Sequence, residues 1–192
     1  MNTDRMKTRV ICVNTGDKYS QWYTDNLKYM IDKYSELNYD EFCIIDEEKY
    51  GDVYDKLQMF DRYRDGQNIF FDLDVLIKGN CNSFLRKDLH VCHAWWRKAY
   101  HTPLNSSIIS WQGDYSHIYE KFDEQSDYYM LKYHLGIDQY LYEIFNPKTF
   151  SIGFCSVQTI EDEQDYNVYF FNQRYERMSE KNWWTNYFLP AQ

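Results

Sequence analysis

Apolar residues in the first part of the chain recur with two different spacings. Short runs rich in β-branched and aromatic residues predict buried strands over 8–14, 40–46 and 68–77. Between these runs, apolar residues three and four positions apart predict amphipathic helices over 19–34 and 52–64. The order strand, helix, strand, helix, strand is typical of a parallel sheet with helices packed against it.

Beyond residue 78 the alternation becomes less regular, although strands and short helices continue. Further strands are expected in "LHVCHAWW", "NSSIISWQ", "FSIGFCSVQ" and "YNVYFFN", and short helices in "YSHIYEKF" and "GIDQYLYEIF". The chain has only three prolines and no Gly/Ser-rich linker, so no domain boundary is indicated. We therefore expect one α/β domain, which is the common outcome for 192 residues.

The charge balance limits the possible partners. The formal net charge is −9 and the pI is about 5.0. Nucleic-acid binding normally needs a basic face, so no nucleic-acid partner is expected. A phosphate-bearing ligand would need a metal ion or a few well-placed cations in so acidic a chain.

The cysteines and the N-terminus indicate a cytoplasmic protein. The five cysteines are odd in number and widely spaced, with no CxxC pair. Free cysteines of this kind are typical of a reducing compartment. The first nine residues, "MNTDRMKTR", lack the apolar core of a signal peptide, and no window is apolar enough for a membrane span.

The segment "NIFFDLDVLIKG" places two aspartates inside an apolar run. Alternate residues of a strand point to the same side, so Asp72 and Asp74 are expected to present their carboxylates together. If the strand ends at Asp72, the pair lies at the edge where open α/β sheets bind ligands. Two adjacent anions need a cation or a proton between them, and hard oxygen ligands suit Mg²⁺ or Mn²⁺.

Two enzyme classes use this local string. In haloacid-dehalogenase-like phosphatases it opens the domain, and the resemblance would make Asp72 a nucleophile and Asp74 a general acid. Two strand–helix units precede the string here, and no later acidic pair completes the Mg²⁺ site of such a phosphatase. The order of the motifs therefore favours the second class.

The chain resembles the nucleotide-sugar glycosyltransferases of the GT-A fold over roughly residues 8–188. It resembles in particular the short glycogenin-like and lipopolysaccharide-galactosyltransferase-like members. The resemblance implies a GT-A-like, Rossmann-type mixed sheet, mostly parallel and flanked by helices. It also implies one domain over 1–192, with a nucleotide-binding half (1–80) and a sugar and acceptor half (81–192). Five motifs carry it in order: "VICVNTGDKYSQWYTDNLKYMI", "DVYDKLQMF", "NIFFDLDVLIKGNCNSFL", "LNSSIISW" and "GIDQYLY".

The resemblance assigns the donor-binding and catalytic residues. Asn14, Thr15 and Tyr19 would hold the base and ribose. Lys56 would pair with a donor phosphate or with Asp72. Asp72 would contact the ribose or sugar, and Asn105 and Ser106 the transferred sugar. The catalytic residues would be Asp138 and Gln139, beside that sugar near the acceptor.

The metal site departs from the family pattern. Asp72 and Asp74 would bind Mn²⁺ or Mg²⁺, and the third ligand of the family is usually a histidine in a late segment. The matching segment here is "NVYFFNQRYERMSEKNWW", which places Asn172 at the histidine position. Arg174 and Arg177 would grip the diphosphate in place of the family's lysine. The tryptophans Trp183 and Trp184 are expected to close the core rather than to stack on a sugar.

The sequence thus predicts a metal-dependent glycosyltransferase that uses a nucleotide-diphosphate sugar, most simply a UDP-sugar. The resemblance to glycogenin-like members favours retention of the anomeric configuration. The acceptor, whether glycan, lipid or protein, stays open. Two alternatives also stay open: the phosphatase with Asp72 as nucleophile, and a non-catalytic nucleotide- or carbohydrate-binding module on a degenerate transferase scaffold.

Overall fold

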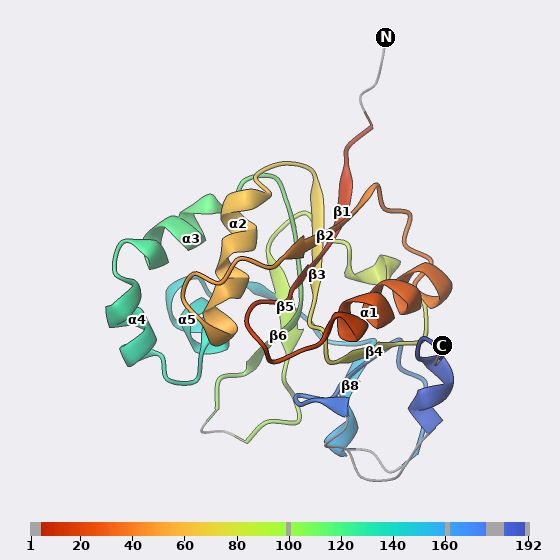
Figure 1. Cartoon of the computed structure of the whole chain (residues 1–192). Coiled ribbons are helices and arrows are strands. Elements are labelled where there is room, and N and C mark those ends of the chain that lie inside the picture. The colour runs from red at the N-terminus through yellow and green to blue at the C-terminus, as the bar shows by residue number, and fades with distance from the viewer. Residues whose placement is uncertain (1–4, 99–100, 160–161, 176–182, 191–192) are drawn as a thin grey trace.

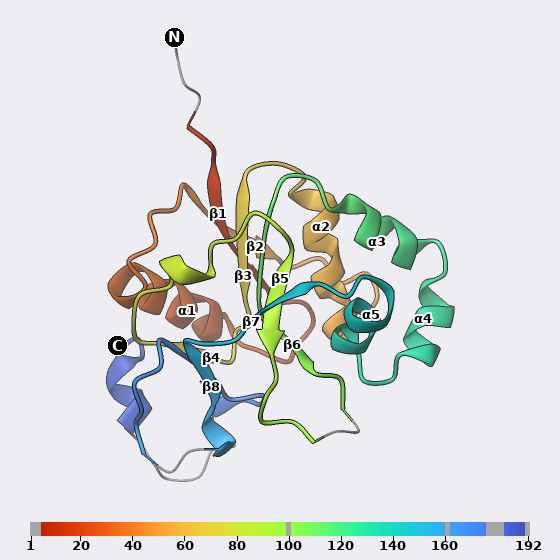
Figure 2. The ribbon, with the colours of Figure 1, turned by 180° about the vertical axis from the view of Figure 1, so that it is seen from behind.

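A computed structural model describes residues 5–98, 101–159, 162–175 and 183–190. The centre of the molecule is a six-stranded sheet in the order β2-β1-β3-β6-β5-β7 (Figures 1 and 2). Its strands are β1 (Thr8–Val13), β2 (Glu41–Ile45), β3 (Gln67–Phe71), β5 (His90–His93), β6 (Leu104–Gln112) and β7 (Lys148–Phe150).

One strand of the central sheet runs against the others. The β1–β2, β1–β3 and β5–β7 pairs are parallel, whereas β6 is antiparallel to both β3 and β5. All strands except β6 therefore point the same way. The predicted mixed, mostly parallel sheet flanked by helices is confirmed.

The single strand predicted over 68–77 is wrong, because the chain changes sheets within it. β3 ends at Phe71, residues 72–74 form a turn, and β4 (Val75–Ile77) enters a second sheet. That sheet has three strands in the order β4-β9-β8, with β8 spanning Phe154–Ser156 and β9 spanning Val168–Phe170. The two aspartates therefore lie in the turn, and the two-residue period of a strand does not explain their common orientation.

The helices follow the apolar spacing with shifted ends. The helix expected over 19–34 begins at Gln21, and the helix expected over 52–64 is a 3-10 helix (Asp52–Leu57) continued by α2. α4 was not predicted from the sequence. Among the described residues, the α-helices are α1 (Gln21–Tyr34), α2 (Gln58–Arg62), α3 (Ser116–Asp123), α4 (Ser126–Lys132) and α5 (Ile137–Ile144), and short 3-10 helices after Leu57 include Asn82–Phe84, Val157–Thr159 and Trp183–Tyr187.

Alternate residues of the central strands enter two separate apolar cores. Val10 of β1 packs in a cluster with α1 and the second sheet, whereas its neighbour Ile11 packs in a cluster with α2, α3, α4 and α5. Ile69 and Phe70 of β3 divide in the same way. The molecule is therefore layered, with α1 and the small sheet on one side and the other helices opposite (Figures 1 and 2).

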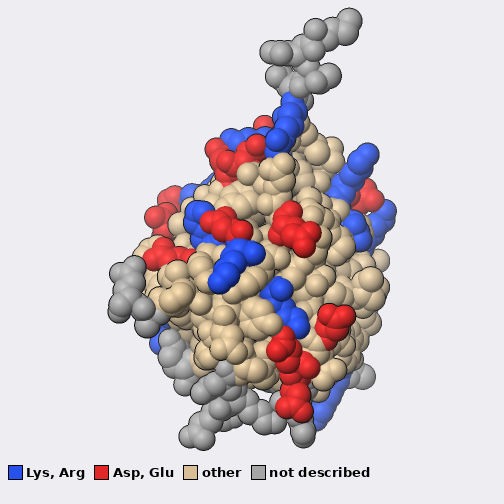
Figure 3. Space-filling model, turned by 90° about the vertical axis from the view of Figure 1, so that its right-hand side faces the viewer, with Lys and Arg blue, Asp and Glu red and all other residues tan. Residues whose placement is uncertain are grey.

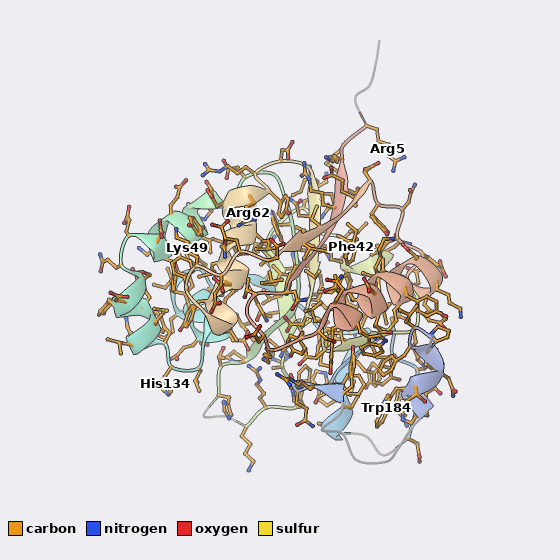
Figure 4. All side chains as sticks on the ribbon, viewed as in Figure 1. Arg5, Phe42, Lys49, Arg62, His134 and Trp184 are labelled. Atoms are coloured by element: carbon orange, nitrogen blue, oxygen red, sulfur yellow. The ribbon has the colours of Figure 1, made fainter. Side chains whose placement is uncertain are left out.

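The C-terminal segment covers the core beside α1. Trp184 is 7% exposed, and its ring meets that of Phe171 with centroids 5.5 Å apart (Figure 4). Packing of this kind matches the expected role of Trp184 in closing the core. Among the described helices, none is both long and apolar enough to cross a membrane. Basic and acidic side chains are interspersed on the face that Figure 3 shows.

Candidate functional site

The site lies at the edge of the sheet where β1 and β3 end. Because β6 runs the other way, its first residues, and not its last, reach this edge. The backbone N–H of Asp72, just after β3, donates to the Ser107 carbonyl at 3.0 Å. The antiparallel strand thereby brings Asn105 and Ser106 beside the paired aspartates.

A cavity of about 390 Å³ opens at this edge. Its volume falls within the range usual for small-molecule sites. It is lined from the β1–α1 loop, the 3-10 helix before α2, the β3–β4 turn, the start of β6 and the start of α5. Most of the predicted site residues line it: Thr15, Tyr19, Lys56, Asp72, Asp74, Asn105, Ser106, Asp138 and Asn172.

Each aspartate of the pair has its own partner. The Lys56 ammonium lies 2.6 Å from Oδ1 of Asp72, so the predicted pairing of these two residues is present. The Tyr19 hydroxyl donates to Oδ2 of Asp74 at 3.0 Å. The β1–α1 loop and the turn of the aspartates are therefore joined directly by side chains.

The pKa values show a crowded group of charges. Burial, and secondly the charge of Asp72, raise the pKa of Asp74 to about 6. Burial also raises the pKa of the Tyr19 hydroxyl, and the Asp74 charge adds to the rise. Burial by itself would lower the pKa of Lys56, but the Asp72 carboxylate outweighs it and leaves that pKa above its ordinary value. A further cation would therefore relieve the repulsion between the two carboxylates.

Asp138 lines the cavity and accepts hydrogen bonds through both of its carboxylate oxygens. Its Oδ1 accepts the backbone N–H of Ser106 at 2.8 Å, and its Oδ2 accepts Nη1 of Arg97 at 2.8 Å. Asp138 is 8% exposed, and an ionised carboxylate is tolerated at that depth because it is paired and hydrogen-bonded. Such a carboxylate is fixed in orientation.

A glycine allows α5 to begin close to the site. Gly136 precedes the helix with φ of +81°, and a Cβ there would stand 2.8 Å from Cγ2 of Val53. A residue with a side chain would be strained by that backbone and would displace Val53, which also lines the cavity. The close approach places Asp138, two residues later, at the cavity wall.

Asn172 lines the cavity from the segment after β9. Its φ is +58°, a left-handed conformation that asparagine accepts more readily than most residues. Its amide Nδ2 donates to the Ser156 hydroxyl at 3.2 Å, so its carbonyl oxygen keeps its capacity to accept or to bind an ion. Among the described residues, no group of three or more His, Cys, Asp or Glu side chains could hold a metal. An ion here would thus depend on the two aspartates and a neutral oxygen.

Some predicted site residues lie outside the cavity wall. The Asn14 amide donates to the Thr24 hydroxyl at 3.2 Å, and Asn14 does not line the cavity, whereas its neighbour Thr15 does. Gln139 is half-buried, and its Nε2 donates to Oε1 of Glu143 at 2.8 Å. Arg174 is not among the residues that line the cavity. Arg177 lies outside the described residues.

Sequence reasoning missed four charged residues of the lining, which are Asp17, Lys18, Glu48 and Arg97. One signal was available for Arg97. The chain carries 30 acidic residues, yet none occurs from Leu89 to Gly113, the stretch that contains this arginine. The ion pair between Arg97 and Asp138 can be identified only in the three-dimensional structure, because 41 positions separate the two residues.

No protein-family model matches the chain, and no curated protein matches it by sequence. Solved structures do match. The galactosyltransferase LgtC, in complex with donor and acceptor sugar analogs, is 9% identical with a TM-score of 0.61, over 84% of this chain and 86% of that one. A glycosyltransferase involved in glycosylation of the major capsid of PBCV-1 is 12% identical with a TM-score of 0.60, over 86% and 92% of the two chains.

A third similar structure is the glycosyltransferase GlyE of Streptococcus pneumoniae TIGR4. It is 12% identical with a TM-score of 0.56. The match covers 76% of this chain but 46% of GlyE, so this chain corresponds to about half of that protein. Together, these likenesses show that the chain has a GT-A-like glycosyltransferase fold.

Proposed function

We propose that this chain transfers a sugar from a nucleotide-diphosphate donor, most simply a UDP-sugar, to an acceptor hydroxyl, with the help of a divalent metal ion. The observation that carries the proposal is the shared cavity of Asp72, Asp74 and Lys56 at the ligand-binding edge of the sheet. Two carboxylates and an ammonium suit a diphosphate and its counter-ion. The GT-A-like fold supports the same placement.

The donor would lie along the cavity from the β1–α1 loop to α5. Thr15 and Tyr19 would contact the nucleoside, and Asn14 would support their loop from behind through its bond to Thr24. Lys56 would turn from Asp72 towards the diphosphate. Ser106 and Asn105 would meet the transferred sugar, beside Asp138.

The side chains present fit a hard divalent ion. Asp72, Asp74 and the carbonyl oxygen of Asn172 are all oxygen ligands, as Mg²⁺ and Mn²⁺ prefer. The raised pKa of Asp74 shows that its charge is poorly compensated by Lys56 and Tyr19 alone. When bound, such an ion would act as a Lewis acid that stabilises the diphosphate leaving group.

The reaction exchanges one bond to the anomeric carbon for another. The bond from the sugar to the diphosphate oxygen breaks, and the nucleoside diphosphate leaves with the electron pair. The acceptor oxygen bonds to the anomeric carbon, and its proton passes to the leaving nucleoside diphosphate. Asp138 would orient the sugar through its fixed carboxylate, while Lys56 would offset charge that develops on the diphosphate. Retention of configuration follows from the resemblance to glycogenin-like enzymes and is part of the proposal.

A thermal-unfolding screen tests the binding part of the proposal. UDP, GDP and their hexose conjugates are added singly, with and without Mn²⁺. A nucleotide at about 100 times its Kd stabilises the folded state by about 2.7 kcal/mol, which raises Tm by roughly 5 °C or more for a domain of this size. We expect this rise only when Mn²⁺ is present. A Tm that no nucleotide changes, with or without the metal, would contradict the proposal.

A further inference from the structure

Arg97 is a cavity residue that the sequence motifs did not indicate. It lies between β5 and β6, and its side chain is 23% exposed. Its Nη1 donates to Oδ2 of Asp138 at 2.8 Å and also to the Leu104 carbonyl. The guanidinium therefore joins the β5–β6 connection, the start of β6 and the start of α5.

The backbone that carries Arg97 is fixed by a turn. The Arg97 N–H donates to the Ala94 carbonyl at 3.0 Å, and the Ala94 N–H donates to the Pro103 carbonyl at 2.7 Å. Trp96 anchors the turn, since its ring packs on Phe154 of the second sheet at a centroid distance of 6.0 Å. Arg97 is therefore held in place before any ligand arrives.

Arg97 and Asp138 can each form further hydrogen bonds beyond those already described. A guanidinium has five N–H donors, and the two on Nη1 serve Asp138 and Leu104. No described residue accepts from Nε or Nη2, and both residues of the pair line the cavity. Each oxygen of Asp138 accepts one bond and has a second lone pair. The pair thus offers donors and acceptors side by side, with no net charge.

We propose that Arg97 is a sugar-binding residue, and that it forms with Asp138 a neutral donor–acceptor pair for two adjacent hydroxyl groups of the transferred sugar. One hydroxyl donates to Asp138, and its neighbour accepts from Arg97. This inference rests on the proposed function and narrows its substrate class to neutral hexoses. A uronic acid keeps the ring hydroxyls but is disfavoured because its carboxylate brings a second negative charge next to Asp138.

Calorimetric titration of the full chain with Mn²⁺ tests this inference. The probes are UDP, UDP-galactose, UDP-glucose and UDP-glucuronate. We expect the wild type to bind at least one neutral UDP-hexose about 10-fold or more tightly than the glucuronate, because repulsion between the uronate carboxylate and Asp138 weakens the latter. Arg97→Ala should lower the affinity for that hexose about 10-fold and change the affinity for UDP less than twofold.

Three further variants separate binding from folding. Arg97→Lys keeps the charge and should restore part of the hexose affinity. The double variant Arg97→Gln with Asp138→Asn leaves no charge buried alone, and it should bind UDP while losing the preference for a neutral hexose. Lys98→Ala removes the adjacent exposed cation, which does not line the cavity, and should behave as the wild type.

The outcomes are distinct. An equal loss of UDP and UDP-hexose affinity in Arg97→Ala would assign Arg97 to the phosphates and overturn the inference, as would unchanged affinity for both. Tighter binding of the glucuronate by the wild type would also overturn it. A wild type that binds none of the four probes, and none of their GDP counterparts, would instead contradict the proposed function itself.

Discussion

Replacing Asp74 by Asn is expected to stabilise the metal-free protein at pH 7.5. The pKa of Asp74 is raised from 3.8 to about 6 in the folded state, chiefly by burial and then by Asp72. The folded protein therefore binds a proton there more tightly than the unfolded chain does. Between pH 3.8 and about 6 the free energy of unfolding falls as the pH rises, by about 3 kcal/mol in total. Asn cannot ionise, so the variant avoids this loss.

Urea denaturation in a chelating buffer measures the effect. At pH 7.5 we expect Asp74→Asn to exceed the wild type by about 3 kcal/mol, and at pH 4 the difference should nearly vanish. Asp123→Asn serves as a control, because its exposed carboxylate has a lowered pKa beside Tyr50 and Lys49, and its removal should not stabilise. A variant of Asp74 that is less stable than the wild type at pH 7.5 would contradict the described charge crowding.

The same variant links stability to function. A carboxylate that lowers the stability of the metal-free protein can serve to bind a cation, and functional residues commonly lower stability in this way. Asp74→Asn should therefore gain stability and lose the part of nucleotide binding that depends on Mn²⁺. Intact metal-dependent binding in this variant would place the ion elsewhere.

Replacing Lys56 by Met is expected to have the opposite effect on stability. Lys56 is the partner of Asp72 at 2.6 Å, and their side chains are 14% and 18% exposed. Its loss leaves two nearby carboxylates without this counter-ion, at a cost of about 3 kcal/mol in the metal-free protein. Affinity for UDP should fall about 10-fold, because a charge-assisted contact to phosphate is lost.

Lys78 provides a matched control. Its side chain is also 14% exposed, and its ammonium lies 2.8 Å from Glu163, a residue between β8 and β9, outside the cavity lining. Because Glu163 is 39% exposed, Lys78→Met should cost at most about 1 kcal/mol. It should also leave UDP affinity unchanged. Equal effects of the two substitutions on UDP binding would remove Lys56 from the site.

The sequence predicted the first half of the fold well, because its apolar spacing is local. Strand β1 and helix α1 appear nearly as expected. The splitting of 68–77 was not predictable from spacing, because β4 leaves the central sheet to pair with β9, more than 90 positions later. An apolar run looks the same whether it continues one strand or passes between two sheets.

The candidate site shows the same division between local and distant information. Asp138 lines the cavity but its neighbour Gln139 does not, since adjacent helical residues point about 100° apart. The sequence motif contains both Asp138 and Gln139, and only the orientation of α5 shows which of the two faces the cavity. Arg97 belongs to no motif and enters the site through contacts with Leu104 and Asp138. Ordered motifs therefore indicated the cavity, whereas its ion pairs required the fold.

Consumption of a nucleotide sugar is the most direct test of the central claim, namely that this cavity supports metal-dependent sugar transfer. The wild type and the double variant Asp72→Ala with Asp74→Ala are incubated with a panel of UDP- and GDP-hexoses, with Mn²⁺ or with a chelator. Released nucleoside diphosphate, sugar and inorganic phosphate are all quantified. We expect the wild type to release nucleoside diphosphate from one donor only with Mn²⁺, and the double variant to be at least about 100-fold slower. Cleavage that proceeds equally well in the double variant, no cleavage of any donor, or release of inorganic phosphate in its place would contradict the account.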